Sequence, residues 1–167
     1  MPKRLANALL FQIGWFACVL GADSLWLLLA GGVLAVHLLW ISSWRAEGPL
    51  ILGVALIGTL IDSLLLKAGV FSFATDGPLI PPWLMVLWAV LAITLNHCLN
   101  WTAKPWWRAS VLGAIGGPMS YYAGSQMAGV ELPLGLWPSM LLLGIVWAVL
   151  FPLLQKLAKI CKHRVWL

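Results

Sequence analysis

A small group of polar side chains interrupts the apolar stretches of this chain, and their types and spacing are those that could do chemistry. Asn96, His97 and Asn100 follow an apolar run that begins at Trp83. If one helix continues through them, Asn96 and Asn100 share a face at i, i+4, with His97 beside it. Three roles are open to this cluster: interhelical hydrogen bonds of about 0.6 kcal/mol each, a ligand or headgroup site, or catalysis by His97. Catalysis is the least favoured, because no nucleophile or metal partner has a suitable spacing.

Depth along the predicted helices, at a rise of about 1.5 Å per residue, sorts the polar side chains into two layers. The inner layer comprises Gln12, His37, Asn96, His97 and Asn100. The outer layer comprises Asp62, Tyr121, Tyr122, Ser125 and Gln126. Side chains within one layer can meet across a helix bundle, whereas side chains of different layers mostly cannot. The predicted ligand-binding residues are Asp62, Asn96, His97, Asn100, Tyr121, Tyr122, Gln12 and His37.

Asp62 is the one carboxylate inside a predicted membrane span. An ionisable group costs at least about 2.5 kcal/mol at the middle of a bilayer, so we expect Asp62 to face the bundle interior and to have a partner. Tyr121 and Tyr122 lie at the same predicted depth, which makes a tyrosine hydroxyl the expected hydrogen-bond donor. Desolvation without a cationic partner favours the neutral acid. Both a structural role and a functional one, as an ion relay or substrate contact, are open.

The composition excludes an ordinary soluble domain. The 167 residues are 62% hydrophobic and only 9% charged, whereas soluble domains carry about 25% charged residues. The formal net charge of +5 comes from basic residues in termini and loops, a distribution that suits membrane orientation better than nucleic-acid binding. Cys18, Cys98 and Cys161 form no disulfide or metal-binding pattern. We therefore predict no metal, no cofactor and no nucleic-acid partner.

Apolar stretches predict an all-α integral membrane protein, a single domain over 1–167 with a bundle of six transmembrane helices. The expected helices span about 5–20, 24–41, 49–66, 83–101, 109–130 and 136–155. The first stretch resembles a signal peptide in length and flanking charge. Gln12, Trp15 and Phe16 inside it favour a retained helix. The long connection at 67–82 is expected to fold back onto the helix ends.

The predicted fifth helix carries small residues at a spacing of three to four positions, including Gly113, Gly117, Ser120 and Gly124. Such a stripe lets a neighbouring helix approach closely, and Pro118 bends the helix. We therefore expect this helix to be buried in the bundle and Gly117→Leu to be strongly destabilising.

Charge placement predicts the orientation of the bundle. Of the ten lysine and arginine residues, all except Lys67 fall on one side of the predicted helices, while Asp23, Asp76 and Glu131 fall on the other. Cytoplasmic loops carry the excess of positive charge, so both termini are expected to be cytoplasmic.

Three strings are similar to one family: NALLFQIGWFACV at 7–19, the LW and TLN elements within 83–96, and GGPMSYYAG at 116–124. Together they resemble the family catalogued as domain of unknown function 2878, small proteobacterial inner-membrane proteins. The resemblance implies a multi-pass protein of the bacterial inner membrane, and it transfers no activity and no catalytic residues. Genes of this family often lie near enzymes that resemble cyclopropane-fatty-acid synthases, which implies lipid metabolism by association only.

Three hypotheses for function follow. The favoured one is a non-enzymatic membrane protein that binds a lipid or small apolar molecule, or that supports lipid-metabolising partners. A small transporter using Asp62 and the Pro118 bend is the second, although the inverted repeats usual in transporters are not recognisable. A membrane-embedded lipid-modifying enzyme is the third, and the lack of HxxxH-type metal patterns places it last. Oligomeric state and ligand identity are open.

Overall fold

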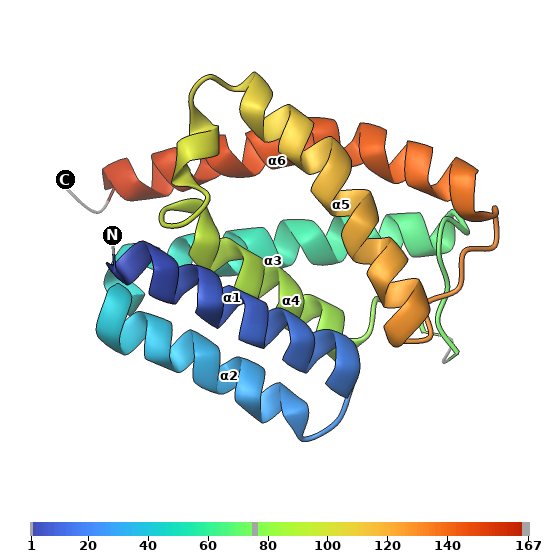
Figure 1. Cartoon of the computed structure of the whole chain (residues 1–167), viewed down its shortest axis with the longest axis horizontal. Helices are drawn as coiled ribbons and strands as arrows, with labels where there is room; N and C mark the ends of the chain where they lie inside the picture. Colours follow the sequence, from blue (N-terminus) through green and yellow to red (C-terminus); the bar gives the residue numbers. More distant parts are fainter. Residues whose placement is uncertain (1, 75–76, 165–167) are drawn as a thin grey trace.

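The structure is a computed structural model that describes residues 2–74 and 77–164, and within them the fold is built from helices without strands (Figure 1). The α-helices are α1 (Pro2–Gly21), α2 (Trp26–Val36), α3 (Trp44–Lys67), α4 (Pro82–Leu95), α5 (Trp107–Met127) and α6 (Leu136–Arg164). Two short segments complete it: the π-helical turn η1 (His37–Ile41) after α2 and the 3-10 turn η2 (Asn100–Ala103) before α5. The predicted all-α chain with six helices is confirmed.

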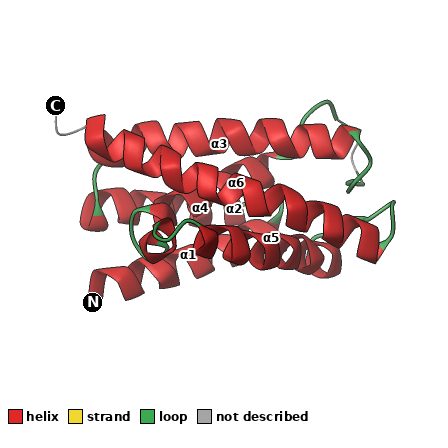
Figure 2. Ribbon diagram, turned by 90° about the horizontal axis from the view of Figure 1, so that it is seen from above, coloured by secondary structure: helices red, strands yellow, loops and turns green. Residues whose placement is uncertain are grey.

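Helix α4 is the centre of the bundle. It packs against α1, α2 and α3, while α3 also contacts α6, and α5 lies against α6. Successive helices run in opposite directions, so the start of α1 and the end of α6 lie at the same end of the molecule (Figures 1 and 2).

Three helices are long and apolar enough to cross a membrane: α1, α3 and the Leu136–Lys162 part of α6. The α2–η1 segment (Trp26–Ile41) and α4 are apolar but shorter. By length and composition, the described part of the chain therefore holds three such helices and not the six that the sequence predicted. The largest difference is the predicted span 83–101, because α4 ends at Leu95.

Helix α4 ends early because a side chain of α1 takes over its last backbone hydrogen bonds. The Cys98 N–H, which would continue the helix by bonding within it, donates instead to Asn7 Oδ1 at 3.1 Å. The Ile93 carbonyl oxygen, which would accept from position 97, accepts from Asn7 Nδ2 at 2.9 Å. Backbone groups freed inside a membrane need such a partner, and Asn7 supplies both a donor and an acceptor.

This break changes the arrangement of the inner polar residues. Asn96 occupies the position directly after α4, and Asn100 begins η2. The two asparagines therefore do not share a face of one continuous helix, and that prediction is wrong. Periodicity along one chain cannot include a cap that another helix provides.

Helix α3 begins earlier than predicted, at Trp44 and not near Pro49. Ser43 caps it, since its Oγ accepts from the Ala46 N–H at 3.3 Å. Glu47, which the sequence placed in a polar loop, therefore lies on the helix and is only 4% exposed.

Helix α6 is longer than predicted and reaches Arg164, whereas the sequence favoured an end near Gln155 and a basic tail. Lys156, Lys159 and Lys162 lie on the helix. Lysine is a good helix former, and positive charge near the C-terminal end is favourable.

Two tryptophans pack against glycines at the centre of the bundle. A Cβ at Gly58 would lie 1.9 Å from the Trp88 ring, and one at Gly117 would lie 2.2 Å from the Trp147 ring. The two indoles stack, with centroids 5.1 Å apart and planes 5° from parallel. A Cβ at Gly113 would lie 2.3 Å from the Trp147 carbonyl oxygen. The predicted burial of the small-residue stripe is confirmed at Gly113 and Gly117, where the stripe faces α6.

The connection between α3 and α4 folds back onto the helix ends, as predicted. Phe71 is fully buried, and its ring centroid lies 5.2 Å from that of Tyr121. Backbone hydrogen bonds also pair Ser72 with Glu131 of the following connection, at 2.9 and 3.0 Å. The connection thereby closes one end of the bundle.

Candidate functional site

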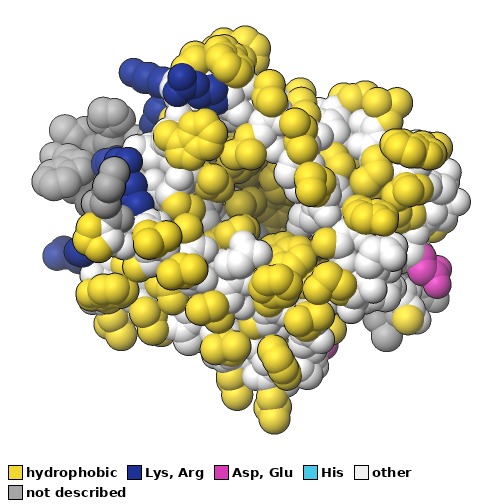
Figure 3. All heavy atoms as spheres, viewed as in Figure 1, with side chains coloured by type: hydrophobic (Ala, Val, Ile, Leu, Met, Phe, Trp, Pro, Cys, Tyr) yellow, Lys and Arg dark blue, Asp and Glu magenta, His cyan; other side chains and the backbone are white. Residues whose placement is uncertain are grey.

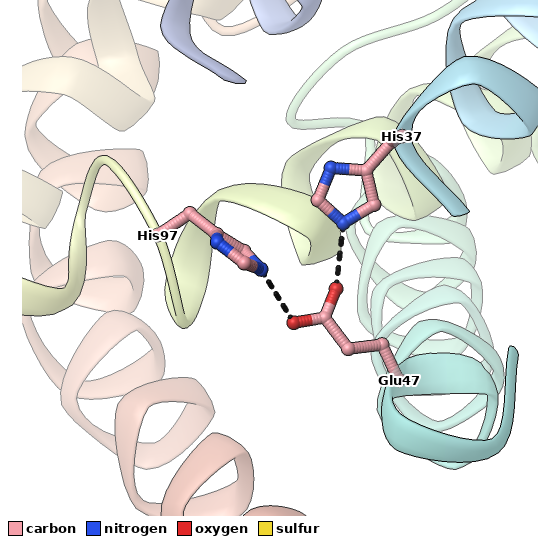
Figure 4. Close-up of side chains that lie close together, drawn as sticks. All are labelled: His37, Glu47 and His97. Atoms are coloured by element: carbon pink, nitrogen blue, oxygen red, sulfur yellow. Dashed lines mark hydrogen bonds and ion pairs between the residues drawn. The ribbon is translucent and has the colours of Figure 1, made fainter. Parts of the chain in front are cut away.

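Three side chains from different elements meet at the end of the bundle where the chain begins (Figure 4). His37 comes from η1, Glu47 from the start of α3, and His97 from the turn after α4. Glu47 Oε2 lies 2.7 Å from His37 Nε2, and Glu47 Oε1 lies 2.7 Å from His97 Nε2. Asn96 Nδ2 lies 3.5 Å from the same Oε1. We call His37, Glu47 and His97 the inner cluster.

Burial differs among these residues. His37 is fully buried and the Glu47 side chain is 5% exposed, whereas the His97 side chain is 21% exposed. The π-helical turn at η1 brings His37 inward, a placement that such turns often serve at functional sites. His97 is therefore the member of the inner cluster that external groups can reach.

Asn7 fixes the tautomer of His37. Its amide orientation is set by the backbone, because only Oδ1 can accept from the Cys98 N–H and only Nδ2 can donate to the Ile93 carbonyl. The same Nδ2 lies 3.2 Å from His37 Nδ1, which must therefore be the acceptor. The proton of His37 then sits on Nε2 and is donated to Glu47.

The side chains of the inner cluster are of types that bind metal ions, so their geometry can be compared with that of a metal site. Two histidines and a carboxylate are a common zinc or iron ligand set, and the three ligating atoms lie within 4.8 Å of one another. A metal on His37 Nε2 would move the proton to Nδ1, against the Asn7 amide donor. Metal-binding histidines instead direct the other ring N–H at an acceptor. The arrangement fits a hydrogen-bonded network better than a metal centre.

The neighbouring Cys98 is not part of this donor set, which comprises His37, Glu47 and His97 among the described residues.

A second polar group lies deeper in the bundle, around Asp62. Tyr121 donates its hydroxyl hydrogen bond to Asp62 Oδ1, and Trp88 Nε1 donates to Asp62 Oδ2 at 2.7 Å. Asp62 is fully buried. The predicted tyrosine partner is confirmed, and it is Tyr121 because Tyr122 is 45% exposed on the other side of α5. We call Asp62, Trp88 and Tyr121 the aspartate cluster.

A cavity of about 490 Å³ lies between α1, α4, α5 and α6, bordered on one side by Trp88 and Tyr121. Its walls are mainly aromatic and aliphatic, and the aromatic residues include Trp15, Phe73, Trp83, Trp88, Tyr121 and Trp147. Gln12 of α1 and Gly116 and Met119 of α5 line it and are exposed. The cavity therefore opens between α1 and α5, where Figure 3 shows a hollow among apolar side chains. We call it the α1–α5 cavity.

The predicted site residues divide among these three places. His37, His97 and Asn96 belong to or adjoin the inner cluster, Asp62 and Tyr121 form the aspartate cluster, and Gln12 lines the α1–α5 cavity. Asn100 and Tyr122 are exposed and lie outside all three.

Sequence reasoning missed Asn7 and Glu47. One signal was available for Glu47: it is the only acidic residue on the side of the chain where the lysines and arginines gather. For Asn7 the signal is weaker, a lone amide one turn into an apolar helix.

No curated protein and no solved structure matches the chain. One family does, over a range that contains both clusters and every residue that lines the cavity. Matched over residues 4–153, the chain belongs to the family described as Protein of unknown function (DUF2878), as the resemblance of its motifs predicted.

Proposed function

We propose that the protein is a multi-pass protein of the bacterial inner membrane that binds a lipid or another small apolar molecule in the α1–α5 cavity, without catalysis. The size and lining of that cavity carry the proposal. Small-molecule sites typically occupy about 300–1,000 Å³ and are mostly apolar with a few polar groups. The α1–α5 cavity, at about 490 Å³, fits this description, and its polar lining side chains are Gln12, Ser120 and Tyr121.

The outer surface of the bundle supports a membrane location. Large apolar side chains are exposed along the helices, among them Leu9 and Phe16 of α1, Leu56 and Leu60 of α3, and Ile145 of α6. A continuous apolar surface of this kind is unfavourable in water and favourable in lipid. On the face that Figure 3 draws, Lys and Arg side chains gather at the end of the bundle where α1 begins and α6 ends. This distribution supports cytoplasmic termini.

Six crossings remain part of the proposal, although the α2–η1 segment and α4 are short, and α5 is long enough but less apolar than α1, α3 and α6. The 14 residues of α4 span about 21 Å, less than the hydrocarbon thickness of about 30 Å. The turn 96–99 and η2 continue the chain toward the cytoplasmic end. Broken helices are tolerated at membrane depth where protein groups satisfy the backbone, which Asn7 does here.

Transport and catalysis are less favoured by the same geometry. A transporter using Asp62 would expose it in turn to each side, and Asp62 is fully buried and bonded to two aromatic residues. Catalysis by the inner cluster would need a substrate space, and the α1–α5 cavity is lined by neither histidine.

The test uses two glycine variants that differ only in position relative to the cavity. Gly116 lines the cavity and a Cβ there meets no atom within 4 Å, whereas Gly32 on α2 also has open space but is not among the lining residues. We expect native mass spectrometry of wild-type protein to show a retained apolar molecule. Gly116→Leu should lower its occupancy about tenfold, while Gly32→Leu should leave it unchanged. Equal occupancy in both variants would contradict the proposal.

A further inference from the structure

We propose that the α1–α5 cavity opens sideways into the hydrocarbon core and binds an uncharged membrane-dissolved lipid whose hydroxyl or carbonyl group is held by Gln12 and Ser120. This inference rests on the proposed function and adds to it the route of entry and the chemical class of the ligand.

The position of the mouth gives the route of entry. Gln12 lies midway along α1, and Gly116, Met119 and Ser120 lie midway along α5. Neighbouring positions on these helices expose Ile13, Phe16 and Ile115, side chains suited to lipid contact. The mouth is therefore surrounded by apolar surface at mid-height of the bundle, far from either aqueous face. A ligand that enters there comes from the bilayer.

Gln12 indicates that the ligand carries a hydrogen-bonding group. Its amide makes no side-chain hydrogen bond to any residue that the structure describes, although it lies in the middle of a helix that is long and apolar enough to cross a membrane. An amide without a hydrogen-bond partner in hydrocarbon is strongly unfavourable, because little water is present there to bond to it. The other polar side chain nearby has a partner, since Trp15 Nε1 donates to Ser120 Oγ at 3.0 Å. Of the described amide and hydroxyl side chains that line the cavity, Gln12 is thus the one without a protein partner.

Ser120 completes a two-point polar site. Its oxygen accepts from Trp15, so its own O–H is available as a donor toward the cavity. Trp15 lies one helical turn beyond Gln12, which places Gln12 on the same face of α1 as the residue bonded to Ser120. The amide and the hydroxyl can therefore approach one group of a ligand together.

The lining excludes a charged group. No Lys, Arg, Asp, Glu or His is among the described residues that line the cavity, and an unpaired charge there would lack a counterion. The apolar body of the ligand fits among Trp83, Trp88 and Trp147. A neutral lipid with an alcohol, ester or ketone group satisfies both the apolar walls and Gln12.

The experiment compares two photoreactive probes in nanodiscs, a diazirine-bearing long-chain alcohol and the diazirine-bearing alkane of the same length, with crosslinks mapped by mass spectrometry. We expect the alcohol to label cavity residues about fivefold more than the alkane, the factor expected of one hydrogen bond. Gln12→Leu should remove this preference, and Ser120→Ala should reduce it. Gln126→Leu, an exposed glutamine of α5 outside the cavity, is the control and should retain it.

Two negative results separate the inference from the proposed function. Labelling of the cavity by both probes equally, unaffected by Gln12→Leu, overturns the polar site while cavity binding stands. Labelling of the cavity by neither probe overturns both.

Discussion

The inner cluster and the aspartate cluster both bury a carboxylate among hydrogen-bond donors, but they do so in different kinds of backbone. Around Glu47 the helices are irregular: η1 is a π-helical turn and α4 stops at Leu95. Around Asp62, α3, α4 and α5 are continuous, and only side chains meet. The comparison shows two uses of buried polar groups in one bundle. The inner cluster, with Asn7 beside it, lies where helices are interrupted and Asn7 satisfies the freed backbone groups, whereas the aspartate cluster joins continuous helices beside a cavity.

The two clusters also differ in what they can tolerate. Asn7, which bonds to His37 of the inner cluster and to two backbone groups, leaves these partners no freedom to adapt. The Tyr121 hydroxyl can rotate and can accept as well as donate. Substitutions at Asn7 and at the inner cluster that it contacts should therefore be more damaging than substitutions at the aspartate cluster.

The largest effect is expected for Asn7→Leu, which leaves the Cys98 N–H, the Ile93 carbonyl and His37 Nδ1 without a partner. Each stranded group costs about 1–3 kcal/mol, so we expect a loss of about 4 kcal/mol in unfolding free energy. Thermal unfolding in detergent, followed by circular dichroism, measures it. Asn100→Leu is the matched control, since Asn100 is exposed and should change stability by less than about 0.5 kcal/mol. Equal losses would mean that Asn7 does not cap α4.

A second, smaller loss of stability is expected at Glu47, where Leu and Gln substitutions distinguish the need for a charge from the need for a hydrogen-bonding side chain. Glu47→Leu strands the Nε2–H groups of His37 and His97 and should cost about 3 kcal/mol. Glu47→Gln should cost about 1 kcal/mol, because its oxygen can accept from His37 while His97 changes tautomer to accept from its amide. The same unfolding assay applies. Should Gln prove as damaging as Leu, the network requires the carboxylate charge.

Gly58→Ala tests whether the lack of a side chain at position 58 allows the Trp88 ring to lie where it can donate to Asp62. The added Cβ would meet the Trp88 ring at 1.9 Å, so the ring must move away from Asp62 and about 2 kcal/mol should be lost. Gly53→Ala on the same helix meets only Leu157 Cδ2 at 3.5 Å and should be neutral or stabilising. Tryptophan fluorescence alongside thermal unfolding would detect the movement, and an unchanged spectrum with unchanged stability would argue against it.

The smallest effect is expected for Asp62→Asn. The asparagine oxygen can accept from Trp88 while its amide donates to the Tyr121 oxygen, so the loss should stay below about 1 kcal/mol. Asp62→Leu strands both donors and should lose about 2 kcal/mol. If Asn abolished function in a complementation assay and left stability intact, the proton of Asp62 would be essential and transport would replace simple binding. Identical behaviour of Asn and Leu would remove Asp62 from the functional residues.

The sequence by itself determined the helical class, six helices and the family, because hydropathy and periodicity are properties of local stretches. It also predicted the tyrosine partner of Asp62, since the rise per residue fixes depth along a helix. The glycine stripe of α5 was predictable for the same reason: its spacing places Gly113 and Gly117 on one side of the helix.

Only the tertiary structure decided where α4 ends, which residues surround Glu47, and that a cavity exists. Asn7 is 91 positions from Cys98, and no local pattern links an amide in one helix to the backbone of another. The rotation of each helix decided that Tyr121 faces inward and Tyr122 outward, although both lie at one depth. The cavity is the space that four helices leave between them, so it depends on their packing together and is encoded in no single stretch.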